Sequence, residues 1–325
     1  MIHELGHYLT ARIFDVAITE FSIGMGPKIF SKVSPETGIR YSLRALPIGG
    51  FVNLVGEKEE SDDERALPTK PIWQRIIIMS AGSVSNLLVG FILAFCMVLS
   101  APALGGNTVA QFDENAASAE CGLAENDRIV RVGKAATYTS DQVVYEIGRS
   151  GSSPGDITVV RDGKRVVLND VKFGTVVEEG IAFGQIDFKV FAVDKNVGNV
   201  IKHSFFRSTL MVKMIWQSIG DLLTGRYGVE QLSGPVGVTE AISTAAKTGS
   251  TNFLYLCALI AVNLGVFNLL PIPALDGSHI VFLLIEWVYG KPVPTKYENA
   301  VHLIGMAALL TLMLYVTLQD IGRLF

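Results

Sequence analysis

Three long apolar stretches set the strongest limit on how this chain can fold. Residues 76–101, 253–270 and 300–318 contain no Lys, Arg, Asp or Glu. A helix needs about 20 apolar residues to cross a bilayer. Over the whole chain 18% of residues are charged, against about 25% in a soluble protein. We therefore expect a multi-pass α-helical membrane protein with a small soluble portion.

A histidine motif precedes these stretches, His3-Glu4-Leu5-Gly6-His7. Residues four apart project from the same face of a helix, so His3 and His7 are expected one turn apart on one face. Two neutral imidazoles in this arrangement are typical ligands of Zn²⁺, and the intervening Glu4 is placed to act as a general base. Two unrelated surface histidines would give the same short pattern.

A second motif makes the zinc interpretation stronger. The segment Asn268-Leu-Leu-Pro271-Ile-Pro273-Ala-Leu275-Asp276-Gly277 follows the stretch at 253–270 and supplies an acidic group as a third ligand. Pro271 and Pro273 disfavour helix, so the backbone before Asp276 is expected to be extended and able to fold toward the histidines.

Residues 15–75 are expected to hold a β-hairpin region and an acidic linker. Strands are predicted at 28–33 and 39–44 around a turn at 35–38. Residues 22–27 resemble a loop, and Pro47-Ile48-Gly49-Gly50-Phe51 is expected to be a glycine-rich loop close to the membrane. An ordinary amphipathic surface hairpin remains the alternative. Six acidic residues within positions 57–64 indicate a solvated linker.

A small α+β module is expected at residues 105–175. Its predicted elements include a helix at 141–149 and strands at 157–160 and 166–168. The segment from Gly122 to Gly133 resembles part of a PDZ domain, a fold that binds an extended peptide at a sheet edge. Residues 176–250 should contain a linker strand, an amphipathic helix at 197–223 and a loop. That helix is expected either on the membrane surface or packed on the soluble module. A short apolar helix and a last span complete 279–325.

Other polar residues have weaker interpretations. Asn86 lies within the 76–101 span, where a polar group needs a partner, and either a role in the site or an interhelical hydrogen bond fits. The remaining histidines, His203, His279 and His302, are expected to be packing or surface residues. Cys96, Cys121 and Cys257 are too far apart to suggest a disulfide framework. The net charge of −4, with no basic stripe, argues against nucleic acid as a partner.

Together the two motifs resemble the site-2 protease family of intramembrane zinc proteases (peptidase family M50), in particular its bacterial RseP type. The resemblance implies that His3, His7 and Asp276 are zinc ligands and that Glu4 is the catalytic base. It also implies substrate contacts at Gly49, Gly50 and Phe51, and with less support at Asn86 and Asn268; Gly82 and Asn86 match a further family motif. The sequence departs from some members of the family in that it has one PDZ-like domain where they have two.

The resemblance further implies the reaction, which is cleavage of transmembrane segments of membrane-protein substrates, for example an anti-sigma factor or signal-peptide remnants. A membrane scaffold that binds peptides without turnover is the alternative. Segment 1–14 is too short to span a bilayer, so we expect further helix upstream. The nine Lys and Arg residues from Arg12 to Arg75 predict a cytoplasmic location for that region and an extracytoplasmic one for the PDZ-like module.

Overall fold

The computed structural model describes residues 1–57, 61–151, 153–178, 181–226, 228 and 232–323. The chain forms two compact units, one of residues 1–92 and 214–325 and the other of residues 93–213. The first unit contains both sequence motifs and is described first. Residues 58–60, which belong to the expected acidic linker, lie outside the described residues.

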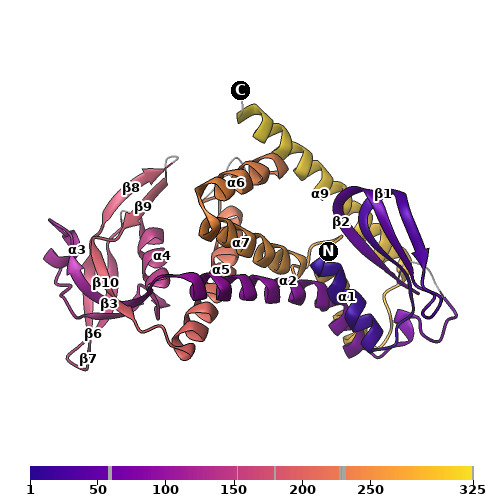
Figure 1. Ribbon diagram of the computed structural model, residues 1–325, viewed down its shortest axis with the longest axis horizontal. Helices are drawn as coiled ribbons and strands as arrows, with labels where there is room; N and C mark the ends of the chain where they lie inside the picture. Colours follow the sequence, from indigo (N-terminus) through magenta and orange to yellow (C-terminus); the bar gives the residue numbers. More distant parts are fainter. Residues whose placement is uncertain (58–60, 152, 179–180, 227, 229–231, 324–325) are drawn as a thin grey trace. The chain divides into compact units, whose positions relative to one another are not determined.

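The first unit is largely helical (Figure 1). Three of its helices are long and apolar enough to cross a membrane, and they cover the three apolar stretches of the sequence: α2 (Ile72–Ser100, whose end lies in the second unit), α7 (Ser250–Asn268) and α9 (Thr295–Arg323). In α9 only 11% of the most apolar 18 residues are buried inside the structure. Most of the apolar surface of this helix is therefore free to contact another apolar environment. Among its described residues, this unit also contains α1 (Ile2–Ile13), η1 (Leu67–Thr69), α6 (Pro235–Thr248), α8 (Asp276–Tyr289) and the end of α5 (Val197–Leu223).

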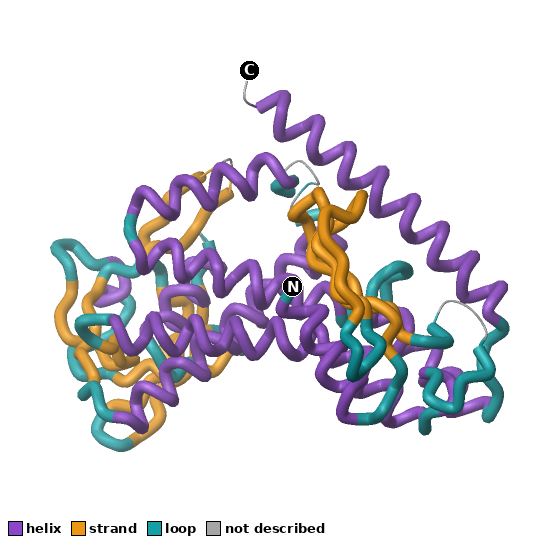
Figure 2. Tube along the Cα trace, turned by 45° about the vertical axis from the view of Figure 1, so that its right-hand side comes forward, coloured by secondary structure: helices purple, strands orange, loops and turns teal. Residues whose placement is uncertain are grey.

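Two long strands, β1 (Ile18–Val33) and β2 (Arg40–Leu54), pair as an antiparallel hairpin. Each strand bends, so residues 20–23 of β1 pair on both sides, with residues 50–53 and with residues 40–43 of β2. Figure 2 shows the two strands doubling back as a narrow twisted ribbon. Apolar residues at the base of the hairpin pack with α1, α2 and α8 in one core, which includes Ala11, Ile18, Leu54, Ile78 and Leu283.

The second unit contains a six-stranded sheet in the order β10-β3-β4-β6-β7, with β5 paired to β4. One helix, α4 (Ser140–Ser150), places Val143 and Ile147 in the core of this sheet. The strands are β3 (Leu104–Phe112), β4 (Arg128–Val132), β5 (Ala135–Ala136), β6 (Gly155–Arg161), β7 (Lys164–Val171) and β10 (Phe188–Val193); a separate ladder pairs β8 (Gly174–Glu178) with β9 (Ile181–Gln185), and a short helix α3 covers Ala117–Glu120.

Most predicted elements are present, but two predicted loops are strands that bend at glycines. The helix expected at 197–223 is α5 (Val197–Leu223), and the helix expected at 141–149 is α4. The predictions of loops at 22–27 and 47–51 are wrong, because both segments lie within the paired strands. Positive φ angles at Gly24, Gly26 and Gly49 let the strands bend without ending.

Two boundaries also differ. The short apolar helix expected within residues 279–325 begins earlier, at Asp276. Pro271 and Pro273 disfavour helix in the segment before it, and Leu275 forms an extended N-cap. The sheet that begins at Leu104 continues to Val193, because β10 pairs with β3, so it reaches beyond residue 175. The three cysteines are free in the structure.

Candidate metal centre

Helix α1 carries both histidines of the first motif on one face. His7 is buried and His3 is half-buried, and their rings meet edge to face with centroids 4.8 Å apart. This is the arrangement that the four-residue spacing predicts for a helix. The backbone N–H of Leu5 donates to the carbonyl oxygen of Met1, so the helix is already formed where His3 lies.

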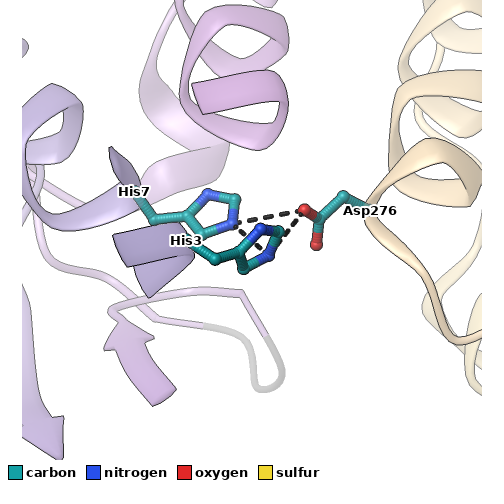
Figure 3. A group of neighbouring side chains, drawn as sticks. All are labelled: His3, His7 and Asp276. Atoms are coloured by element: carbon teal, nitrogen blue, oxygen red, sulfur yellow. Dashed lines mark hydrogen bonds and ion pairs between the residues drawn. The ribbon is translucent and has the colours of Figure 1, made fainter. Parts of the chain in front are cut away.

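The second motif brings Asp276 to the same place. Helix α7 ends at Asn268, the proline segment forms a turn, and α8 begins at Asp276. Gly277 permits the tight turn, because a Cβ there would lie 2.1 Å from the carbonyl oxygen of Leu270. The carboxylate of Asp276 therefore projects from the first turn of α8 toward the two histidines (Figure 3).

Three ligand-type atoms converge at this point. Oδ2 of Asp276 lies 3.0 Å from Nε2 of His3 and 3.3 Å from Nε2 of His7, and the two Nε2 atoms are 3.2 Å apart. Ligands 2.0–2.1 Å from a tetrahedral zinc ion are separated by about 3.3 Å. The spacing of the three atoms thus fits one zinc ion.

The hydrogen bonds around the histidines support the same conclusion. Nδ1 of His7 donates to the carbonyl oxygen of Ile78 in α2 at 2.8 Å, which leaves Nε2 of a neutral His7 with a free lone pair. Oδ2 of Asp276 is buried, and beyond the two Nε2 atoms it has no hydrogen-bond partner among the described residues. Lone pairs that face one another without a shared proton repel, whereas a cation between them is stabilised.

Helix α2 lies directly against the ligands and has glycine where they touch it. A Cβ on Gly82 would lie 2.3 Å from Nε2 of His7 and 2.6 Å from Cε1 of His3. One turn further on, the side-chain amide of Asn86 is 3.4 Å from Nδ1 of His3. Asn86 of α2 therefore contacts a residue of α1, as the interhelical interpretation predicts, and a role in the site stays a prediction.

The hairpin reaches the site through Gly50. A Cβ at this position would lie 3.4 Å from Cγ of Glu4 and 2.7 Å from the carbonyl oxygen of Ser22. The neighbouring Phe51 packs under the guanidinium group of Arg44, 4.8 Å from the ring centre. The structure thus brings Gly50, and the strand that carries it, beside the half-buried Glu4.

Two predicted site residues, Gly49 and Asn268, do not contact the proposed ligands. Gly49 faces Cε of Met25 instead, at a distance of 3.1 Å from a Cβ built on the glycine. Asn268 is half-buried at the end of α7, and within the described part of the chain its side chain has no hydrogen bond to the ligand residues.

Sequence reasoning missed a second cluster behind Asp276. His279, Glu298 and His302 place their ligand-type atoms within 4.8 Å of one another. The expectation that these two histidines are packing residues is correct insofar as their rings stack at 4.3 Å. The spacing of Asp276 and His279, three residues apart on a helix, is the signal that places them on one face.

Comparison with known proteins agrees with this geometry. The sequence profile described as Peptidase family M50 matches residues 1–312. A protein of Clostridium perfringens is 33% identical over 323 residues, which cover 99% of this chain and 94% of that protein.

Two further relatives carry functional names. "Zinc metalloprotease RasP" of Bacillus licheniformis is 30% identical and "Regulator of sigma-W protease RasP" of Bacillus subtilis is 29% identical, each over 99% of this chain and at least 95% of the relative. With the family profile matched over nearly its full length, this chain belongs to peptidase family M50, the site-2 proteases.

Proposed function

We propose that this chain is a zinc-dependent intramembrane endopeptidase that cleaves transmembrane segments of membrane proteins. The observation that carries the proposal is the convergence of His3, His7 and Asp276 with the spacing of three zinc ligands, next to Glu4. Their positions on α1 and α8, beside the apolar helix α2, favour a reaction within or at the edge of the bilayer.

The roles of the residues follow from their chemistry. His3 and His7 would hold zinc through Nε2 and Asp276 would hold it through Oδ2. Bound zinc would act as a Lewis acid on the scissile carbonyl and make water more acidic. Glu4 would accept the proton of the attacking water and later return it to the leaving amine. The carbonyl of Ile78 would hold His7 in the tautomer that binds metal.

The hairpin would hold the substrate. A transmembrane helix hides its carbonyl groups in its own hydrogen bonds, so cleavage requires an unwound segment. Residues 50–53 pair with β1 on one edge, and the described residues provide no strand on their other edge. An unwound substrate segment could pair there as an added strand and pass close to Glu4, which Gly50 adjoins.

The second unit would select substrates. We propose that its sheet and α4 form a PDZ-like domain that binds an extended peptide. This unit would take no part in the chemistry, because all four proposed catalytic and ligand residues belong to the first unit. One relative is named as a protease that regulates sigma-W. With the family resemblance, this favours membrane-bound substrates, for example an anti-sigma factor or signal-peptide remnants. The bacterial inner membrane is the proposed location, with the PDZ-like domain outside the cytoplasm.

The test uses the full chain purified in detergent and a synthetic transmembrane peptide. We expect one zinc ion per chain, loss of cleavage after removal of zinc by a chelator, and recovery when zinc is added back. Cleavage that persists without zinc would contradict the proposal. One bound zinc without cleavage of any transmembrane substrate would instead support the alternative, a scaffold without turnover.

A further inference from the structure

Helix α9 holds the segment around Asp276 at two points, one on each side of this residue. Nδ1 of His302 accepts a hydrogen bond from the backbone N–H of Ala274, two residues before Asp276, at 3.0 Å. Oε1 of Glu298 lies 3.0 Å from Nδ1 of His279, three residues after Asp276. His302 and Glu298 are one helical turn apart on α9, so one face of this helix makes both contacts.

The proline segment needs such support from outside. Ala274 has a φ of +74°, a conformation that side chains other than glycine adopt at a cost. Pro271 and Pro273 have no N–H to donate, which leaves the segment few hydrogen bonds of its own. Helix α9 also packs closely on the segment, because a Cβ on Gly305 would lie 2.2 Å from Cβ of Pro273.

The same cluster of His279, Glu298 and His302 has the residue types of a metal site, but its hydrogen bonds argue otherwise. The Nδ1 lone pair of His302 is already occupied by the N–H of Ala274. A neutral imidazole then carries its proton on Nε2 and has no second lone pair for a metal. Nε2 is buried and has no hydrogen-bond partner among the described residues. It lies 3.9 Å from Oε1 of Glu298, which is within ion-pair distance but too far for a hydrogen bond.

We infer that His302 and Glu298 are positioning residues, which set the direction of the Asp276 carboxylate by fixing the backbone on both sides of it. Among the described residues Oδ2 of Asp276 contacts the Nε2 atoms of His3 and His7, the other two proposed ligands. No further hydrogen-bond donor among these residues holds this oxygen, so the backbone on either side of Asp276 helps to set its direction. The inference rests on the proposed function, in which Asp276 is a zinc ligand. Loss of an outer partner of a metal ligand typically weakens metal binding about 10–100-fold.

The experiment compares His302→Leu with His302→Asn in the full chain. The two side chains have nearly the same shape, but the oxygen of Asn can accept the N–H of Ala274 and Leu cannot. Zinc affinity is measured by competition with a chelator, and the visible spectrum of the Co²⁺-substituted protein reports the ligand geometry. We expect His302→Leu to weaken zinc binding about 10–100-fold and to alter the cobalt spectrum, while His302→Asn stays close to the parent chain.

Two further variants complete the design. Glu298→Leu removes the contact with His279 and should weaken zinc binding in the same direction; it also provides a test if His302→Leu does not fold. Asp276→Ala should abolish high-affinity binding and so checks the ligand assignment itself.

Three results would overturn the inference. Folded His302→Leu and Glu298→Leu proteins with the parent zinc affinity and cobalt spectrum would show that α9 does not position Asp276. A second zinc equivalent that is lost in His302→Leu would show that the cluster is a metal site. Full zinc affinity in Asp276→Ala would contradict the ligand assignment of the proposed function and the inference with it.

Discussion

Gly82 lies so close to His7 that a Cβ at position 82 would be 2.3 Å from the imidazole Nε2. The atom that would be displaced is the one proposed to bind zinc, and the same Cβ would also meet the ring of His3. Helix α2 therefore forms the wall against which both histidines of α1 are placed, and a glycine is required where they touch it.

Gly82→Ala should accordingly weaken zinc binding and cleavage together, because contacts below 3.0 Å force the imidazoles to move. We expect zinc affinity to fall at least about 10-fold, as it does when a residue that orients a metal ligand is lost. The matched control is Gly220→Ala in α5, where a new Cβ meets nothing within 4 Å. There alanine should be neutral or stabilise the helix by up to about 1 kcal/mol. Equal zinc affinity in Gly82→Ala and the parent chain would contradict the packing described.

Asp276→Ala should remove zinc at ordinary concentrations, because two histidines alone form an incomplete site. We expect zinc affinity to fall more than about 100-fold, because loss of a residue that only supports a ligand already lowers it about 10–100-fold. Glu286→Gln is the matched control, since Glu286 lies on the same helix but pairs with Arg75 at 2.8 Å. Titration with a chelator measures both. Retention of tight zinc binding by Asp276→Ala, with loss in Glu286→Gln, would reassign the third ligand.

Part of this site follows from the sequence alone. The spacing of His3 and His7 predicts their common face, and the two prolines predict the break that frees Asp276, because helix periodicity and the lack of a proline N–H act locally. Gly82 and His302 contact residues that are remote in sequence. The family motif pointed to Gly82 and Asn86 of α2, but no local pattern reports which residue of α9 faces the segment before Asp276, so the contact of His302 with Ala274 could not be predicted.

The hairpin is a second case in which contacts between remote segments, and not the local sequence, decide the structure. Glycine and proline at 24–27 and 47–50 have low strand propensity, which led to the prediction of loops. Pairing with two neighbouring segments outweighs that propensity, because residues 20–23 are bonded on both sides. Strand propensity depends on neighbours that are remote in sequence, whereas the α5 and α4 predictions used helix periodicity within one segment.

The stability of the hairpin should depend on pH through Glu20, a buried residue. Burial raises the pKa of Glu20, but the neighbouring Ser42 hydroxyl, Arg44 at 2.9 Å and Lys28 at 3.2 Å together outweigh it, and the pKa falls to about 2. A Glu in an unfolded chain has a pKa of about 4.3. The contribution of Glu20 to stability is therefore complete above about pH 4.3 and is lost as the pH falls toward about 2.

Thermal unfolding of the parent chain and Glu20→Gln between pH 6 and pH 2 measures this contribution. The parent should unfold at the higher temperature at pH 6, and the difference should shrink as the pH falls. Glu36→Gln, in the exposed turn between β1 and β2, is the control and should show no such trend. A difference between the parent and Glu20→Gln that is constant over this range would contradict the proposed ion pairs.

The most direct test of the central claim is zinc content and cleavage measured on one purified sample of Glu4→Gln. The substitution leaves His3, His7 and Asp276 in place and removes only the base. We predict one bound zinc ion per chain, as in the parent, and a cleavage rate at least about 100-fold lower, since general-base catalysis typically contributes 10²–10⁴-fold. Cleavage near the parent rate with zinc bound would contradict the role of Glu4. Loss of zinc from this variant would contradict the assignment of the three ligands as a self-sufficient site.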